Sequence, residues 1–235
     1  MTPRDVVAIV AAGGSGERFQ SSTPKQFLAL AGKPLLAHTV TAFLRSPDVH
    51  RVVLVLPGRG FENYVGIMSP WLKESDRLEV IAGGDSRQDS VWNGISRLSS
   101  AFEGWVVVHD GARPLVTRAL IRDVVDAAKR LGGALAALPV DQTLKEVDSG
   151  ATVLRTVDRR RYYQAQTPQC FRHRVLRAAF ERARGEGFQG TDEAQLVERL
   201  GEKVHLVPGL VRNLKVTTEE HLALAEYYLT LGEDV

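Results

Sequence analysis

The 235-residue sequence predicts an α/β fold in which a mostly parallel sheet is flanked by helices. Short, apolar, β-branched segments alternate along the chain with segments whose apolar residues recur at helical spacing. The apolar segments are continuous, as expected for strands whose two faces are both covered by helices. A period-two segment near residue 150 adds an antiparallel β-hairpin that protrudes from this core.

Five segments are predicted strands, each bounded by glycine, proline or charged residues. They cover residues 6–11, 52–56, 78–82, 106–109 and 134–140. A helix is predicted to start at Pro34 and another after Thr117, because proline suits the first helical turn and a threonine hydroxyl caps free N–H groups. Two further helices are predicted near residues 191–200 and 219–231.

The hairpin prediction comes from residues 143–157, which alternate with period two on both sides of the turn Asp148-Ser149-Gly150. Its apolar side chains are few and charges are interleaved with them, so we do not expect it to be core. We expect a single domain over residues 1–235 with an arm at residues 141–160. A second subunit would give this arm a surface to lean on.

Composition excludes several classes of protein. With 44% hydrophobic and 25% charged residues, the chain has the composition of an ordinary globular protein. Its net charge of +2 is too balanced for binding nucleic acid through an overall positive field. The single cysteine, Cys170, cannot form an internal disulfide, which favours a reducing compartment. The amino terminus has too short an apolar run for a signal peptide or a membrane span. We therefore expect a cytoplasmic protein that binds neither nucleic acid nor membrane.

The first predicted strand runs into a glycine-rich turn, AAGGSGERF, followed by PKQF. A strand, then glycines, then a helix presents backbone N–H groups to an anion. The P-loop pattern fails because Arg18 stands five residues after Gly13, and the dinucleotide pattern G-x-G-x-x-G fails at Phe19. Arg18 and Lys25 add two cations to the backbone donors, which suits several phosphates bound together. The alternative is a plain strand-to-helix turn with two solvated cations.

Asp110 closes the fourth predicted strand, in the segment VVVHDGARP. Open α/β sheets bind ligands at the carboxyl ends of their strands, and a carboxylate beside phosphates is a natural ligand for Mg²⁺. The alternative is a helix cap or a salt bridge with Arg113. Thr191 is likewise a good N-cap, and Lys215, expected on a short strand before the last helix, has the alternative of a surface lysine.

The glycine turn resembles the A-A-G-x-G-x-R-[FM] and P-K-Q-[FY] opening of nucleotidyltransferases that activate small phosphorylated alcohols and sugars. Four later segments continue the resemblance: GGDSRQDSVWNG, VVVHDGARP, AQTPQCF and TDEAQLVERL. The glycines of the first of these suit the close approach of a flat base. The third and fourth also suit turns before helices. In this order, and across nearly the whole chain, the segments resemble the 2-C-methyl-D-erythritol 4-phosphate cytidylyltransferase family of the non-mevalonate isoprenoid pathway.

The resemblance implies a Rossmann-like nucleotidyltransferase core and a homodimer whose subunits clasp each other through their arms. It implies transfer of the cytidylyl group of CTP to 2-C-methyl-D-erythritol 4-phosphate, which gives 4-diphosphocytidyl-2-C-methyl-D-erythritol and pyrophosphate. Mg²⁺ or another divalent cation is the implied cofactor. The chain also has no segment that matches the cyclodiphosphate synthase domain fused to some relatives.

The resemblance also implies roles for individual residues. The catalytic cations are Arg18, Lys25 and Lys215, and Asp110 is the metal ligand. The nucleotide-binding residues are Ala11, Ala12, Gly13, Gly14, Gly16, Gly84, Asp85 and Ser90. The residues around the second substrate are Arg159, Thr167 and Thr191, joined by Arg113 and Thr143 from the partner subunit.

The sequence departs from the family pattern at three places, of which Gly111 in place of the usual alanine is a minor change. Gln142 stands where relatives usually carry an aspartate, and Arg212 stands where an acidic residue often precedes the asparagine. Two alternative functions stay open at this point. One is a related cytidylyltransferase acting on ribitol phosphate or another sugar phosphate, and the other is a nucleotide-binding module without turnover.

Overall fold

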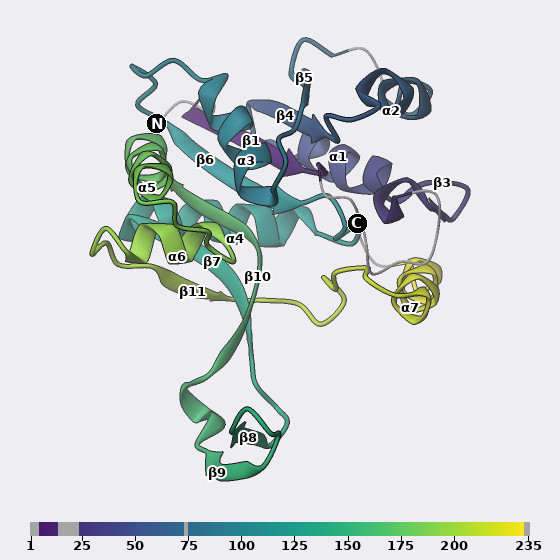
Figure 1. The fold of residues 1–235 in the computed structure, drawn as a ribbon. Coiled ribbons are helices and arrows are strands. Elements are labelled where there is room, and N and C mark those ends of the chain that lie inside the picture. The colour runs from purple at the N-terminus through teal and green to yellow at the C-terminus, as the bar shows by residue number, and fades with distance from the viewer. Residues whose placement is uncertain (1–4, 14–23, 73–74, 233–235) are drawn as a thin grey trace.

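The computed structural model describes residues 5–13, 24–72 and 75–232 and contains a seven-stranded sheet in the order β11-β7-β10-β6-β1-β4-β5 (Figure 1). Neighbouring strands are parallel except where β10 pairs with β6 and β7. The predicted fold class, a mostly parallel sheet between helices, is confirmed. The strands are β1 (Val6–Ala11), β4 (Arg51–Leu56), β5 (Leu78–Ala82), β6 (Trp105–Asp110), β7 (Gly133–Pro139), β10 (Tyr163–Arg172) and β11 (His205–Pro208).

The five predicted strands are all present, and β1 and β5 have the predicted bounds. β4 and β6 each begin one residue earlier than predicted, because Arg51 pairs with Val7 and Trp105 pairs with Val6. β6 also ends one residue later, at Asp110, which pairs with Ala11. Pairing with β1 therefore extends both strands beyond their apolar runs.

The segment AQTPQCF is a strand, and the interpretation of it as a turn before a helix was wrong. It lies in β10, between β6 and β7, and its residues Gln169, Cys170 and Phe171 pair with both neighbouring strands. Proline cannot donate to a ladder, and the strand accommodates Pro168 within a register shift between Ala165 and Gln169. This interruption lies beside the carboxyl end of β6.

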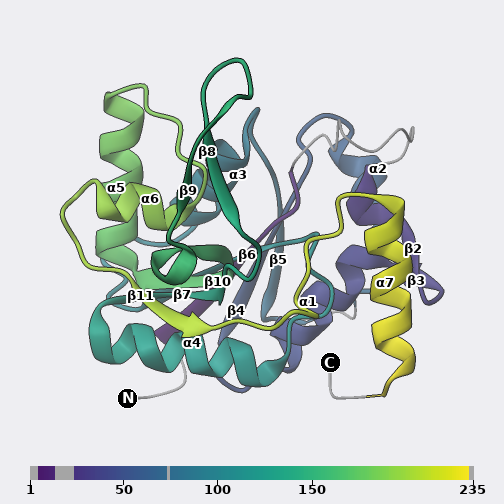
Figure 2. The same ribbon diagram turned by 90° about the horizontal axis from the view of Figure 1, so that it is seen from below.

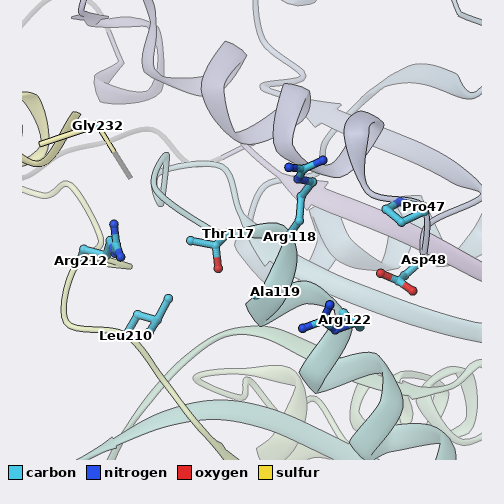
Figure 3. Close-up of a pocket in the computed structure, with 9 residues that line it drawn as sticks. All are labelled: Pro47, Asp48, Thr117, Arg118, Ala119, Arg122, Leu210, Arg212 and Gly232. Carbon is cyan, nitrogen blue, oxygen red and sulfur yellow. The ribbon is translucent and has the colours of Figure 1, made fainter. Parts of the chain in front are cut away.

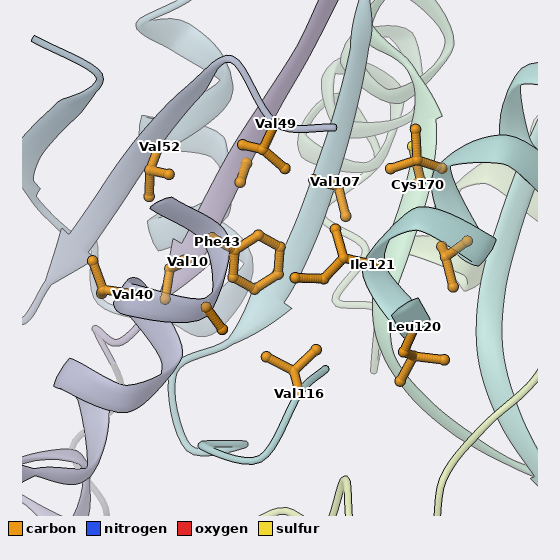
Figure 4. Close-up of a cluster of buried hydrophobic side chains, with 14 of the residues drawn as sticks. Val10, Val40, Phe43, Val49, Val52, Val107, Val116, Leu120, Ile121 and Cys170 are labelled. Carbon is orange, nitrogen blue, oxygen red and sulfur yellow. The ribbon is translucent and has the colours of Figure 1, made fainter. Parts of the chain in front are cut away.

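Helices cover both faces of the sheet, as the continuous apolar strands predict (Figure 2). One face carries α1 (Leu35–Arg45), α2 (Phe61–Met68) and α4 (Arg118–Leu131). The other carries α3 (Arg87–Ser96), α5 (His173–Gly185) and α6 (Glu193–Glu198). Figure 4 shows the first face, where Phe43 of α1 lies between Val10 of β1 and Ile121 of α4. Burial of one such side chain stabilises the fold by about 1.5–3 kcal/mol.

Thr117 caps α4 as predicted, because its hydroxyl accepts a 3.1 Å hydrogen bond from the N–H of Leu120. The predicted cap of α6 was wrong by one residue. Asp192, rather than Thr191, accepts the N–H of Gln195 at 2.9 Å. An aspartate and a threonine both suit this position, and only the turn of the backbone decides between neighbours.

The strand order places a topological switch point at β1. From β1 the chain moves outward through β4 and β5, then returns to β6 on the other side of β1. The connections of β1 and β6 therefore leave the sheet in opposite directions, and a crevice opens at their carboxyl ends. Ala11 and Asp110 are paired at this edge.

The predicted hairpin arm is confirmed as a separate two-stranded sheet of β8 (Leu144–Val147) and β9 (Val153–Val157), which protrudes from the core in Figure 1. Its side chains Val147, Val153 and Leu154 are exposed. The remaining elements are η2 (Lys25–Phe27), β2 (Ala29–Leu30), β3 (Lys33–Pro34), η3 (Arg159–Arg161) and α7 (Glu219–Thr230).

The last helix, α7, packs through Ala225 against Leu30, Leu35 and Val216. Lys215 precedes it in a segment without strand pairing, so the prediction of a short strand there was wrong. Within the described ranges, no helix has the length and apolarity needed to cross a membrane.

Candidate active site

The carboxylate of Asp110 lies at the switch point and is surrounded by cations. Its Oδ1 accepts a 2.9 Å hydrogen bond from Nε of Arg87, and its Oδ2 lies 2.8 Å from Nζ of Lys215. Nε of Arg113 stands 3.7 Å from the same Oδ2. Burial alone would raise the pKa of Asp110, but Arg87, Lys215 and Arg113 outweigh it and hold that pKa well below its usual range. The carboxylate is therefore ionised.

Arg87 is itself anchored by a second carboxylate. Its Nη1 and Nη2 donate to the two oxygens of Glu193 at 2.6 and 3.0 Å, and Glu193 is only 1% exposed. Burial lowers the pKa of Arg87, but Glu193 and Asp110 more than compensate and raise it above its usual range. The bidentate geometry fixes the plane of the guanidinium.

A buried chain of hydrogen bonds supports Asp110 from below. The N–H of Asp110 donates to the hydroxyl of Thr167 at 3.1 Å, and that hydroxyl lies 3.0 Å from Nδ1 of His109. Nε2 of His109 lies 3.2 Å from the carbonyl of Arg113. Burial lowers the pKa of His109 to about 3, despite the favourable carbonyl of Arg113, so the ring is neutral. Since a carbonyl only accepts, Nε2 carries the proton and Nδ1 accepts from Thr167.

A pocket of about 230 Å³ lies beside Asp110. The structure brings five of the predicted site residues to it: Asp110, Arg113, Thr167, Thr191 and Lys215. The hydroxyl of Thr167 donates its hydrogen bond within the protein, to Nδ1 of His109. Thr191 is exposed, and its N–H donates to Oε1 of Gln195 at 2.8 Å.

Two predicted arginines lie in different parts of the molecule. Arg113 was expected to reach into a partner subunit, but it is buried in the pocket of its own chain and donates to the carbonyl of Asn213 at 2.8 Å. Arg159 lies exposed on η3 at the base of the arm, where it donates to the carbonyl of Asp141, so its place beside the second substrate stays a prediction. Thr143 is also exposed on the arm. The core thus presents Arg113, and the arm presents Arg159 and Thr143.

Ser90 joins the two glycine loops that were predicted to hold a nucleotide. It is fully buried, and its hydroxyl accepts the N–H of Gly84 at 3.2 Å. A Cβ on Gly13 would stand only 2.4 Å from that hydroxyl oxygen. Only glycine therefore allows the first loop to approach α3 this closely. Ser90 thus stabilises the two loops. Binding of a nucleotide by their backbone groups stays a prediction.

The end of β1 is held from the PKQF motif. Nε2 of Gln26 donates to the carbonyl of Ala12 at 2.8 Å, and Lys25 opens η2 directly before it. Ala11 is the last residue of β1, and Asp85 is exposed on the loop that follows β5. The predicted residues Gly14, Gly16 and Arg18 lie outside the described part of the chain. A common cleft for Arg18, Lys25 and Asp110 therefore stays a prediction.

The comparison with known proteins decides the family. The sequence model of the 2-C-methyl-D-erythritol 4-phosphate cytidylyltransferase family matches residues 6–231. The chain belongs to this cytidylyltransferase family. A relative of that name from Syntrophus aciditrophicus is 45% identical over 99% of both chains. One from Geotalea uraniireducens is 42% identical over 95% of this chain and 96% of its own.

Solved structures agree with this membership. The 2-C-methyl-D-erythritol 4-phosphate cytidylyltransferase of Thermus thermophilus superposes with a TM-score of 0.75 at 35% identity, covering 97% of this chain and 99% of its own. The 4-diphosphocytidyl-2C-methyl-D-erythritol synthase of Anaerococcus prevotii gives a TM-score of 0.83 at 27% identity, covering 97% of this chain and all of its own.

Sequence reasoning missed several residues of the cytidylyltransferase site. These are Gln26, Arg87, His109, Glu193 and Asn213. Each stands inside a family motif or beside a predicted site residue, so a signal existed. What the sequence does not display is burial: an arginine and a glutamate in helices are ordinarily solvated.

The donors present fit a divalent cation that is shared with phosphates. Within the described ranges, no group of three or more His, Cys, Asp or Glu side chains is arranged to hold a metal. Mg²⁺ commonly takes one or two carboxylates and completes its shell with phosphate oxygens and water. The ionised Asp110 supplies one such carboxylate at the switch point.

A second hollow, of about 790 Å³, lies at the start of α4 (Figure 3). Arg118 and Arg122 of α4 line it together with Arg212, Asp48 and other residues of three separate segments. None of the predicted site residues lines it.

Proposed function

We propose that this chain transfers the cytidylyl group of CTP to 2-C-methyl-D-erythritol 4-phosphate. One oxygen of the acceptor phosphate attacks the α-phosphorus of CTP, the bond to the β-phosphate breaks, and pyrophosphate leaves. The observation that carries this proposal is the ionised Asp110 at the switch point, held among Arg87, Arg113 and Lys215, in a chain of the cytidylyltransferase family. Together with the glycine turn and a bound divalent cation, these side chains would neutralise the charge of the two anionic substrates.

The protein's task in such a reaction is alignment and charge neutralisation, because phosphoryl chemistry needs no covalent intermediate with the enzyme. We propose that backbone N–H groups of residues 12–16 hold the triphosphate. Arg18 and Lys25 would stabilise the charge that grows on the α-phosphate and on the leaving group. A bound Mg²⁺ would neutralise phosphate charge, and Asp110 is the residue placed to hold it.

We also propose that the chain acts as a homodimer through the arm at residues 141–160. The exposed apolar side chains of the arm, Val147, Val153 and Leu154, support this, because a hairpin of this size has no core of its own. Exchange of arms would carry Arg159 and Thr143 toward the partner's pocket. We further propose that the protein is cytoplasmic, which the buried free thiol of Cys170 supports, because a reducing compartment keeps thiols free. We propose that residues 1–235 form one domain.

Release of pyrophosphate tests the proposal directly. We expect rapid release from CTP with 2-C-methyl-D-erythritol 4-phosphate, and at least about 10²-fold less with ribitol phosphate, because a site built for one polar acceptor rejects analogues with other hydroxyl positions. Equal rates with both acceptors would favour a broader sugar-phosphate transferase. Tight CTP binding without product would favour a nucleotide-binding module.

A further inference from the structure

The two oxygens of Asp110 are held by cations of different freedom. Oδ1 faces Arg87, whose other nitrogens make two hydrogen bonds to Glu193. Oδ2 lies 2.8 Å from Nζ of Lys215, and Nε of Arg113 stands further from it, at 3.7 Å. Asp110 is the one ion-pair partner that Lys215 has among the described residues. The side chains of Lys215 and Arg87 are 37% and 29% exposed, but only Arg87 is held by a buried partner, Glu193, which is 1% exposed. The contact of Arg87 with Oδ1 is therefore fixed by Glu193, whereas the contact of Lys215 with Oδ2 has no such support.

This difference decides which contact breaks first. Withdrawing Arg87 from Asp110 would strain or break two charge-assisted hydrogen bonds to a buried carboxylate, which are the strong kind. A lysine ammonium on its flexible stem leaves Oδ2 by rotation of its own side chain, and Lys215 breaks no other ion pair with a described residue when it does so. Oδ2 is therefore the oxygen that can change partner while Oδ1 keeps the carboxylate in place.

We propose that Arg87 and Glu193 form a positioning pair for Asp110. They fix the carboxylate through Oδ1 and reserve Oδ2 for an exchangeable cation, which is Lys215 in the free protein and a divalent metal ion in the CTP complex. Displaced from Oδ2, Lys215 is free to turn toward the anionic substrates. This inference rests on the proposed function for its nucleotide and its metal.

The pair also links two helices across the pocket. Arg87 is the first residue of α3, and Glu193 is the first residue of α6. The cap of α6, Asp192, accepts a 3.0 Å hydrogen bond from Gln169 of β10. The start of α6 is thus held to the sheet, and this fixes the position of Glu193. Glu193 in turn fixes Arg87, and Arg87 fixes the carboxylate of Asp110.

The test measures metal binding without turnover. Mn²⁺ is titrated into the protein with CTP and no acceptor, and water-proton relaxation reports the ion held on the protein. We expect Glu193→Gln to weaken Mn²⁺ binding by about 10- to 100-fold, as loss of a supporting partner behind a metal ligand typically does. The matched control is Glu198→Gln, on the same helix but exposed, which should bind Mn²⁺ as the wild type does.

A second variant covers the case in which Glu193→Gln fails to fold. Replacing both members, Arg87→Met with Glu193→Met, removes the two charges together, which buried pairs tolerate better than loss of one partner. We expect this double variant to keep its fold and to lose Mn²⁺ affinity to a similar degree. A folded single or double variant with wild-type Mn²⁺ affinity would overturn the inference.

Failure of the proposed function looks different. A wild type that binds Mn²⁺ with CTP but releases no pyrophosphate would refute the transferase, while a weakened Glu193→Gln would still support the positioning pair. A wild type that holds no Mn²⁺ in the presence of CTP would refute the exchange at Oδ2.

Discussion

The hydroxyl of Thr167 donates a 3.0 Å hydrogen bond to Nδ1 of His109, and this bond exists only while the ring is neutral. Both residues are buried, and Thr167 in turn receives the N–H of Asp110. Protonation of His109 would turn its acceptor into a donor, so the hydroxyl of Thr167 would have to turn its proton away and lose this hydrogen bond as a donor. The support beneath Asp110 therefore depends on an uncharged histidine.

This dependence predicts a loss of stability in acid. The folded pKa of His109 is about 3 and its unfolded pKa is about 6.5, so between these values the unfolded chain binds more protons and the free energy of unfolding falls as the pH falls. From pH 6.5 to 5, His109 accounts for a loss of about 2 kcal/mol. Urea unfolding at both pH values measures it. The variant His109→Gln should lose about 2 kcal/mol less than the wild type, and equal losses would contradict the assignment.

The contact between Gly13 and Ser90 predicts a steric effect on nucleotide binding. In Gly13→Ala the new methyl group would stand 2.4 Å from Oγ of Ser90, so the loop must move. We expect the KM for CTP to rise about tenfold, the effect of losing one good hydrogen bond to the triphosphate. Adding Ser90→Ala should recover part of this loss, because the remaining contact is 3.1 Å.

A matched glycine controls for the added methyl group. A Cβ on Gly66 of α2 would meet nothing within 4 Å, so Gly66→Ala should leave the KM unchanged. A Gly13→Ala variant with the KM of the wild type would show that this loop does not approach the nucleotide.

The two cations of the glycine turn carry a prediction about rate. We expect Lys25→Ala and Arg18→Ala each to lower kcat by about 10²- to 10³-fold, the usual cost of losing one donor to a developing oxyanion. Folding should be intact. Thermal unfolding and steady-state kinetics of both variants test this, with the exposed Lys203→Ala as control. Turnover near that of the wild type would remove the residue concerned from the catalytic group.

Sequence patterns predict those strands whose own residues form an apolar run. β1 and β5 are predicted to the residue because apolar runs stop at glycine or charge. β10 is missed because Pro168 and its polar neighbours favour a turn, and only pairing with both β6 and β7 makes a strand there. The same limit applies to the site. Asp110, Thr167 and Lys215 are predicted from motifs, whereas the pairing of half-buried Arg87 with buried Glu193 comes from packing between distant helices.

The separation of Arg159 from the pocket makes a prediction about the dimer. Arg159 lies on the arm and Lys215 lies in the core pocket. With exchanged arms, each active site would combine the core of one subunit with the arm of its partner. Arg159→Ala and Lys215→Ala should then each be nearly inactive alone. The two defects would lie on opposite sides of a shared site, one on the arm and one in the core.

Mixing the two variants distinguishes exchange from a site within one chain. In a mixed dimer, the core of the Arg159→Ala subunit meets the intact arm of the Lys215→Ala subunit and forms one complete site, while the other site carries both defects. After dissociation and random reassociation of equal amounts, half of the dimers are mixed, so about a quarter of the wild-type activity should return. If each arm serves its own core, mixing restores nothing, because every site keeps one defect. Pairing Arg159→Ala with Thr143→Ala, two changes on the arm, should also restore nothing under exchange, since every site of the mixed dimer still receives an altered arm.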